Sequence, residues 1–159
     1  INGHLKSKGI NLRIRPPKGW TVEEGNGPNV VKKFVNKGRV FVIITKDAAT
    51  FFSRSAYREM YSDEASIRDF AKSVNCAGGE LVDYALVTVG MHPAIQFESK
   101  CPKEIIGKKY VMTQISWSIF YEDKTVLLMG MGSNNVEFGE LKNLYSMVAA
   151  TTSFPEQFN

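Results

Sequence analysis

Histidine and cysteine, on which metal sites and many active sites depend, are scarce in this sequence. Its 159 residues include two histidines and two cysteines. His4 and His92 have no cysteine or carboxylate at metal-ligand spacing, so the sequence predicts no metal site and no cofactor. We expect His4 to lie in a flexible N-terminal segment, residues 1–9, and His92 to be a turn residue.

Long apolar runs and dense runs of one charge are also missing. The longest apolar run, residues 40–44, is far shorter than the roughly 20 residues that cross a bilayer, so no transmembrane segment is predicted. The net charge is +4, but the basic residues are scattered and do not form the dense runs of nucleic-acid-binding arms. We therefore expect no nucleic-acid partner. A weak attraction to an anionic polymer or membrane surface remains open.

No group of residues predicts catalysis. A cysteine nucleophile needs a nearby histidine, and Cys101 and His92 lie at opposite ends of a predicted strand about 25–30 Å long. Three pairs of adjacent carboxylates occur, and we expect all of them to be solvated. Glu23 and Glu24 would face opposite sides of a strand, and the other two pairs lie in helix caps and turns: Asp63 and Glu64, and Glu122 and Asp123. We expect no catalytic residues and no enzymatic activity.

Two features leave alternatives open. Cys76 and Cys101 either form a disulfide, which would stabilise the fold by about 3 kcal/mol, or are two buried free thiols. Gly130 and Gly132 mark either a bulge or close backbone contact, or room for a ligand beside Met129 and Met131.

Composition and periodicity predict one α+β domain. Apolar residues make up 43% and charged residues 23% of the chain, as in ordinary globular proteins, and the length suits a single domain covering residues 1–159. β-branched and alternating runs predict strands over residues 11–15, 20–24, 30–35, 39–46, 81–89, 94–100, 109–121 and 125–131. We therefore expect an antiparallel sheet of about six to eight strands flanked by helices, an α/β/α sandwich.

Two helices are predicted from apolar residues at helical spacing. The first has an apolar face of Ile67, Phe70, Ala71 and Val74, and begins at a cap provided by Ser62 or Asp63. The second has an apolar face of Phe138, Leu141, Leu144, Tyr145 and Val148, after a cap at Asn134 or Asn135. In the strand over residues 109–121, Gln114, Ser116 and Ser118 form a polar row that we expect to be visible to water.

Residues 48–61 fit neither period and predict a long excursion with some helical turn. It carries four aromatic rings with two arginines between them, which is typical of a lid over a pocket or of a protein-docking loop. The candidate binding surface therefore consists of Phe51, Phe52, Arg54, Tyr57, Arg58 and Tyr61.

Several short motifs resemble the PsbP-like (Mog/PsbP-like) superfamily. The opening segment is followed by Pro17-Lys18-Gly19-Trp20, and Asp69-Phe70-Ala71 lies in the first predicted helix. A hairpin around Gly38, the turn Gly90-Met91-His92-Pro93 and a closing helix agree in order, so the resemblance covers residues 11–154. It implies an antiparallel sheet sandwiched by helices, in a protein that binds or helps to assemble other proteins, and it supplies no catalytic residues.

These observations favour a non-enzymatic protein-binding or assembly-accessory domain of a bacterial envelope or secreted protein. The alternative is a small-molecule carrier or enzyme that uses a pocket between the sheet and residues 48–61. Because the chain starts at Ile1, we expect a signal peptide, a lipoprotein leader or a tag before it. We therefore expect an extracytoplasmic location, periplasmic, secreted or lipid-anchored, with the cytoplasm as the alternative.

Overall fold

The computed structural model describes residues 11–25, 29–47, 53–121, 124–132 and 135–155. The segment of residues 1–9, predicted to be flexible, lies outside them. The elements are β1 (Thr21–Glu24), β2 (Val30–Asn36), β3 (Arg39–Asp47), α1 (Arg54–Met60), α2 (Glu64–Val74), β4 (Glu80–Val89), β5 (His92–Ile105), β6 (Lys108–Tyr121), β7 (Lys124–Gly132) and α3 (Asn135–Ala150).

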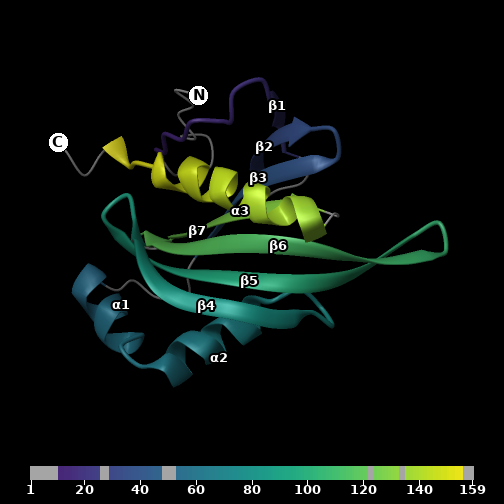
Figure 1. Ribbon diagram of the computed structural model, residues 1–159. Helices are drawn as coiled ribbons and strands as arrows, with labels where there is room; N and C mark the ends of the chain where they lie inside the picture. Colours follow the sequence, from purple (N-terminus) through teal and green to yellow (C-terminus); the bar gives the residue numbers. More distant parts are fainter. Residues whose placement is uncertain (1–10, 26–28, 48–52, 122–123, 133–134, 156–159) are drawn as a thin grey trace.

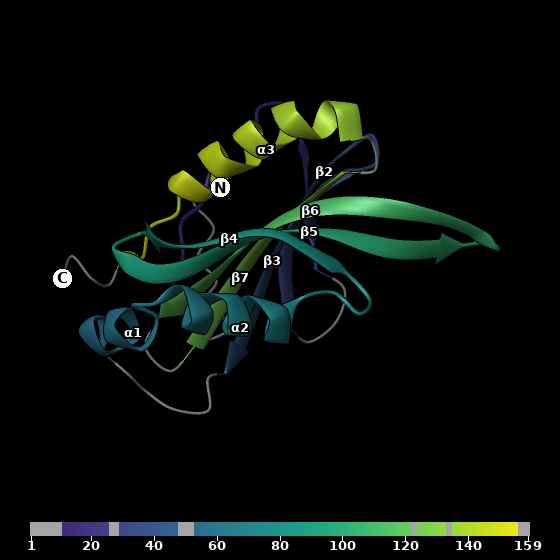
Figure 2. The ribbon, with the colours of Figure 1, turned by 60° about the horizontal axis from the view of Figure 1, so that its bottom comes forward.

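The strands form one antiparallel sheet with the order β1-β2-β3-β7-β6-β5-β4. Helix α3 lies on one face of the sheet, and α1 and α2 lie on the other (Figures 1 and 2). The predicted α+β class with an antiparallel sheet between helices is therefore confirmed. The pairing of β3 with β7, for example Val42 with Met129, joins the N-terminal hairpin to the C-terminal one.

Three of the strand connections are two-residue turns in which both central residues have positive φ, as type I′ hairpins require. The central pairs are Lys37 (46°) and Gly38 (80°), Gly90 (56°) and Met91 (71°), and Ile106 (51°) and Gly107 (75°). These turns fix the registers of β2 with β3, β4 with β5, and β5 with β6.

The larger core lies between α3 and the sheet. A Cβ added to Gly130 would lie 2.3 Å from the Tyr145 ring, so β7 has glycine where α3 packs most closely. The Tyr145 hydroxyl donates a hydrogen bond of 2.6 Å to the carbonyl oxygen of Met131. A Cβ on Gly132 would likewise meet the side chain of Leu141. Both glycines therefore allow α3 to pack closely on the sheet. The space beside these glycines is occupied by α3 and is not free for a ligand.

The second core lies between α1, α2 and the opposite face of the sheet. The Asp63 side chain accepts a hydrogen bond of 2.7 Å from the Ser66 amide and caps α2, one of the two predicted capping residues. Ala71 of α2 is buried against β5 and β6 together with Ile95 and Phe120. Ile67 and Phe70 of the predicted apolar face pack against this core as well, whereas Val74 is 40% exposed.

The prediction of a strand over residues 11–15 is wrong, although the alternation of apolar and polar residues in this segment does reflect burial. Leu12 and Ile14 are buried in the larger core, as a period of two predicts. The backbone, however, forms a single bridge, between Arg13 and Ser153, through two hydrogen bonds of 2.9 Å. Because this segment lies beside the residues after α3 and not beside a strand, it does not extend into a ladder.

The strand predicted over residues 94–100 is too short, since β5 runs from His92 to Ile105. The prediction took Pro102 as a strand breaker. In the structure the pairing of β4 with β5 ends at Lys100, so no described strand pairs with β5 on that side of Pro102. Proline is tolerated there because no partner strand needs its missing N–H.

The polar row on β6 is buried, which corrects the expectation that water would reach it. Gln114, Ser116 and Ser118 are all almost inaccessible. In the sheet Ser116 lies between Phe97 of β5 and Met129 of β7. Longer side chains therefore flank the short serines on both sides.

Candidate interaction site

The aromatic part of the predicted binding surface faces the interior. Phe51 and Phe52 lie outside the described residues. Tyr57 is 5% exposed, and its ring stacks on Phe120 with the centroids 4.6 Å apart. Tyr61 stacks on the same Phe120 ring at 5.2 Å. Burial raises the pKa of both tyrosine hydroxyls. These two rings fasten α1 to the sheet, so they pack inward and do not belong to an exposed binding surface.

The two arginines of the predicted surface remain at the periphery. Arg54 is half-buried at the start of α1, and Arg58 is exposed. The Arg58 guanidinium donates a hydrogen bond of 3.4 Å to the carbonyl oxygen of Met91, in the β4–β5 turn. Arg58 therefore links α1 to a turn of the sheet.

The residues considered for catalysis are placed in structural roles. His92 is the first residue of β5 and is buried, with its ring edge-on to Tyr121 at 4.8 Å and to Phe154 at 5.0 Å. Its assignment as a turn residue is therefore corrected to a core residue. Cys101 is bonded to Cys76 and carries no thiol. No group of three metal-ligating side chains occurs among the residues that the structure describes.

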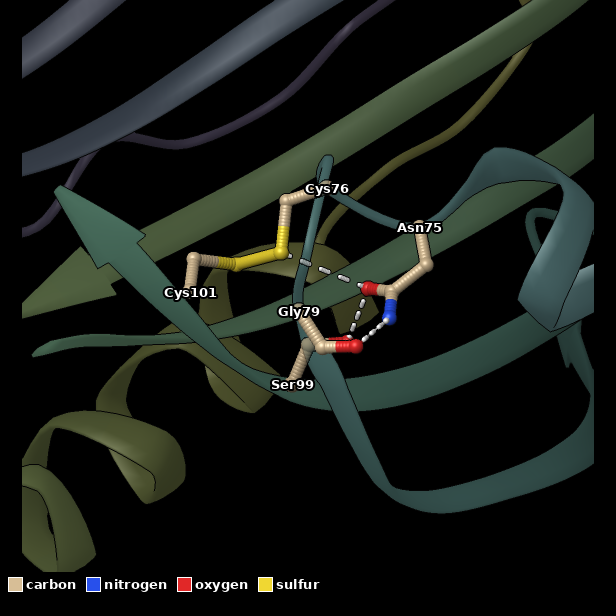
Figure 3. The surroundings of a disulfide bond; sticks show 5 residues. All are labelled: Asn75, Cys76, Gly79, Ser99 and Cys101. Atoms are coloured by element: carbon tan, nitrogen blue, oxygen red, sulfur yellow. Dashed lines mark hydrogen bonds between the residues drawn. A yellow bond between two sulfur atoms is a disulfide. The ribbon is translucent and has the colours of Figure 1, made fainter.

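Cys76 and Cys101 form a disulfide with their Cα atoms 6.0 Å apart (Figure 3). Asn75, directly before Cys76, accepts a 2.5 Å hydrogen bond from the Ser99 hydroxyl and donates one of 3.3 Å to the Gly79 carbonyl oxygen. Of the two alternatives left by the sequence, the structure contains the disulfide. It ties the segment after α2 to β5 at the point where β5 leaves the body of the sheet.

Beyond this point β5 and β6 continue as a two-stranded hairpin, which we call the hairpin arm and define as residues 101–112. Pairing of β4 with β5 ends at Lys100, and pairing of β6 with β7 ends at Thr113. Among the residues that the structure describes, the arm is therefore paired only with itself, and it projects past the other strands at the right of Figures 1 and 2. Its five paired positions give it a reach of about 16 Å at about 3.3 Å per residue.

The tip of the hairpin arm exposes aliphatic side chains among lysines. Ile106 is 98% exposed, Ile105 56% and Val111 47%. Cross-strand pairing sets Ile105 opposite Lys108 and Glu104 opposite Lys109, and Lys103 lies on the next pair. The six residues that line a hollow of about 430 Å³ on the arm are Pro102, Lys103, Glu104, Lys109, Tyr110 and Val111.

The backbone of Ile106 is unusual. Its φ of 51° lies in the left-handed region, which glycine and asparagine adopt readily and β-branched residues rarely do. Neither packing nor turn geometry explains an isoleucine at this position, because the side chain is almost fully exposed. A residue that is locally unfavourable and also exposed is a candidate for a contact outside the chain.

The sequence reasoning missed this arm because it treated residues 101–108 as a connection. One signal was present. Ile106 directly precedes Gly107, so an aliphatic residue occupies a position where turn chemistry favours asparagine or aspartate, and a second one, Ile105, comes before it.

A cleft of about 370 Å³ opens elsewhere, between the end of α2 and strands β3, β6 and β7. Its lining consists of Lys46, Asp47, Phe70, Ser73, Val74, Asn75, Ser118, Thr125 and Leu127. The alternative prediction placed a pocket between the sheet and residues 48–61. None of the described residues of that excursion lines the cleft, because the rings of α1 are packed against Phe120.

Comparisons with known proteins show the fold. No protein-family model matches the sequence, and no curated protein matches it. The structure is similar to that of the cyanobacterial PsbP, CyanoP, from Synechocystis sp. PCC 6803, with a TM-score of 0.57, 14% identity, and coverage of 93% of this chain and 88% of that chain.

It is also similar to LpqN, which is involved in cell envelope biogenesis of Mycobacterium tuberculosis, with a TM-score of 0.58, 14% identity, and coverage of 90% of this chain and 82% of that chain. Among the described residues, no helix is both long and apolar enough to cross a bilayer. The fold that the short sequence motifs implied is therefore confirmed, and the chain has a PsbP-like fold.

Proposed function

We propose that this chain is a non-enzymatic accessory domain of the cell envelope, and that it works by docking through the hairpin arm onto another envelope component. The observation that carries the proposal is the tip of the arm. Ile105 and Ile106 are exposed beyond the body of the sheet, and Ile106 adopts a backbone conformation that its side chain disfavours.

Three further points support a non-enzymatic domain that acts by docking. Exposed aliphatic residues gathered at one place mark interaction sites more often than scattered ones do. Cys101 is bonded to Cys76 at the base of the arm, and His92, the histidine considered as its catalytic partner, is buried among aromatic rings. Both residues therefore have structural roles. LpqN, one of the two similar structures, is involved in cell envelope biogenesis.

The proposal is tested by sedimentation with envelope fragments from the organism that encodes the chain. The purified chain is compared with the double variant Ile105→Ser/Ile106→Ser, which removes the aliphatic tip. We expect the wild type to sediment with the fragments and the variant to bind about tenfold or more weakly, because each aliphatic side chain contributes roughly 1.5–3 kcal/mol when buried.

A matched control keeps the result specific. Met147 lies on α3 and is 68% exposed, so Met147→Ser makes the same kind of change away from the arm. We expect this variant to sediment like the wild type, and both variants to keep the wild-type melting temperature within a few degrees. A wild-type chain that stays in the supernatant, or an arm variant that sediments equally well, contradicts the proposal.

The cleft beside α2 keeps a small-molecule carrier as the second candidate. It combines apolar walls from Phe70, Val74 and Leu127 with the hydroxyl groups of Ser73 and Thr125. A carrier would gain stability from its ligand, so a thermal-shift screen of small metabolites is the test. A hit that Leu127→Trp abolishes, and that the arm variant leaves intact, would favour this candidate.

A further inference from the structure

We infer that the partner of the hairpin arm is an anionic lipid surface, into which the Ile105–Ile106 tip inserts while Lys103, Lys108 and Lys109 contact lipid headgroups. This inference rests on the proposed docking function and names the chemistry of its partner.

The tip has the arrangement that an interfacial anchor needs. Ile106 stands at the turn and Ile105 on the preceding position, both exposed to solvent. Lys108 is paired with Ile105, and Lys109 follows one position further from the turn. Apolar groups at the end of the arm and cations just behind them match the order of acyl chains and headgroups across a membrane interface.

The charges on the arm favour an anionic surface. Three lysines and one glutamate, Glu104, lie between Pro102 and Tyr110. A lysine has a long aliphatic stem and a charged end, so its stem can lie along apolar surface while the ammonium group stays at headgroup level. Near an anionic leaflet each lysine adds to the attraction. The net charge of the chain, +4, acts in the same direction.

The dimensions of the arm allow insertion without contact by the body of the fold. Interfacial elements bury their apolar groups about 5–10 Å into the headgroup and acyl boundary. The arm reaches about 16 Å beyond the last positions paired with β4 and β7, at about 3.3 Å per residue. Its tip can therefore enter the interface while the sheet and helices remain in water.

A protein partner fits the tip less well. Stable protein interfaces bury about 800 Å² on each partner and are enriched in aromatic residues and arginine, whereas lysine is depleted from them. The tip instead offers two isoleucines, Ile105 and Ile106, with lysines immediately beside them. Lysine next to exposed aliphatic groups is what an anionic lipid surface accepts and a protein interface disfavours.

Vesicle flotation tests the inference with two kinds of protein-free vesicle. One contains phosphatidylcholine alone, and the other contains phosphatidylcholine with phosphatidylglycerol. We expect the wild type to float with the phosphatidylglycerol vesicles, to bind phosphatidylcholine more weakly, and to lose binding as salt rises. Ile106→Asn suits the turn and removes the aliphatic group, so it should bind about tenfold or more weakly.

Two further variants separate the contributions. Lys108→Gln/Lys109→Gln should weaken binding to anionic vesicles about tenfold or more and reduce the salt dependence, because two of the charges are removed. Met91→Asn is the matched control, since Met91 also lies in a two-residue turn with positive φ and is 49% exposed. We expect this control to bind like the wild type.

The outcomes separate the inference from the proposed function. The lipid inference is overturned if the wild type fails to float with anionic vesicles, if it binds neutral vesicles equally well, or if Ile106→Asn binds like the wild type. Sedimentation with envelope fragments but not with vesicles also overturns it. That last result leaves the docking function in place, with an envelope component other than these lipids as the partner.

Discussion

Ile106 combines a fully solvated side chain with a backbone conformation that carries strain for a β-branched residue. Its φ is 51° and its side chain is 98% exposed. Strain of this kind amounts to about 1–3 kcal/mol per residue. Since no intramolecular packing offsets it, the fold would be more stable with a residue that adopts the left-handed region readily. At this position, the proposed docking and the stability of the fold therefore favour different side chains.

This conflict gives the first prediction. Ile106→Asn should raise the free energy of unfolding by about 1 kcal/mol, because asparagine followed by Gly107 suits a type I′ turn. For a chain of this length the melting temperature should rise by about 2–4 °C in a thermal scan. Met91→Asn should give a smaller rise, because methionine is not β-branched. A fall in melting temperature for Ile106→Asn would show that the side chain is held by contacts within the fold.

A second residue-scale prediction concerns two buried serines that differ in their hydrogen bonding. The Ser116 hydroxyl is buried without a hydrogen-bond partner among the described residues, whereas the Ser99 hydroxyl donates to Asn75 over 2.5 Å. Ser116→Ala should stabilise the fold by about 1 kcal/mol, and Ser99→Ala should destabilise it by a similar amount. Chemical denaturation of both variants measures the two signs. Destabilisation by Ser116→Ala would indicate that a buried water satisfies the hydroxyl.

At the scale of elements, local sequence signals predicted the hairpins and helices but not the extent of β5. The β2–β3 hairpin follows from β-branched runs around Gly38, and α2 from its Asp63 cap and apolar spacing. Pro102 misled the prediction, because whether a proline breaks a strand depends on which neighbours the strand has at that point. The arm could therefore be predicted only from its unusual turn residues.

The burial of the polar row on β6 could not be predicted either, because it also depends on contacts with distant segments. Alternation correctly assigned Ser116 and Ser118 to the face opposite Trp117, but it could not indicate what covers that face. The cover comes from α2 and from longer side chains on β5 and β7, for example Phe97 and Leu127. These are contacts between segments far apart in the sequence.

The disulfide gives the third prediction, because it connects two elements. It closes a loop with a sequence separation of 25 between the end of α2 and the base of the arm. Cys76→Ala/Cys101→Ala should lower the free energy of unfolding by about 3 kcal/mol. The melting temperature should fall by about 6–12 °C, and amide hydrogen exchange should increase in residues 64–74.

Reduction of the wild-type disulfide serves as the control for this prediction. It removes the same cross-link without changing a side chain's carbon skeleton, so the reduced protein should melt close to the double variant. A double variant that melts like the oxidised wild type would contradict the assignment of stability to the cross-link.

At the scale of the whole molecule, the order of elements predicted the α+β class, and the short motifs predicted the PsbP-like fold. The sheet order was less accessible. The pairing of β3 with β7 joins Arg39–Asp47 to Lys124–Gly132, and no local signal marks two strands so far apart as neighbours. This pairing places the strands in one sheet that carries a core on each face.

That arrangement predicts that the two cores unfold together. Strand β6 contributes Trp117 to the core under α3 and Phe120 to the core under α1 and α2, on opposite faces of one strand. Phe120→Ala removes the ring on which Tyr57 and Tyr61 stack, and should lower the free energy of unfolding by about 3–5 kcal/mol. Because the cavity arises on the face remote from Trp117, and Trp20 packs against the same core as Trp117, tryptophan fluorescence reports on the core under α3.

If the sheet couples the two cores, the fluorescence midpoint and the midpoint from far-ultraviolet circular dichroism should shift by the same amount in Phe120→Ala. If the α1–α2 layer instead unfolds by itself, the circular dichroism signal should fall first while the fluorescence of Trp117 stays native. Met147→Ala, on the exposed side of α3, should change the free energy of unfolding obtained from either signal by no more than about 0.5 kcal/mol. Separate midpoints would mean that the α1–α2 layer unfolds as an independent unit. The sheet would then stay folded through its packing against α3.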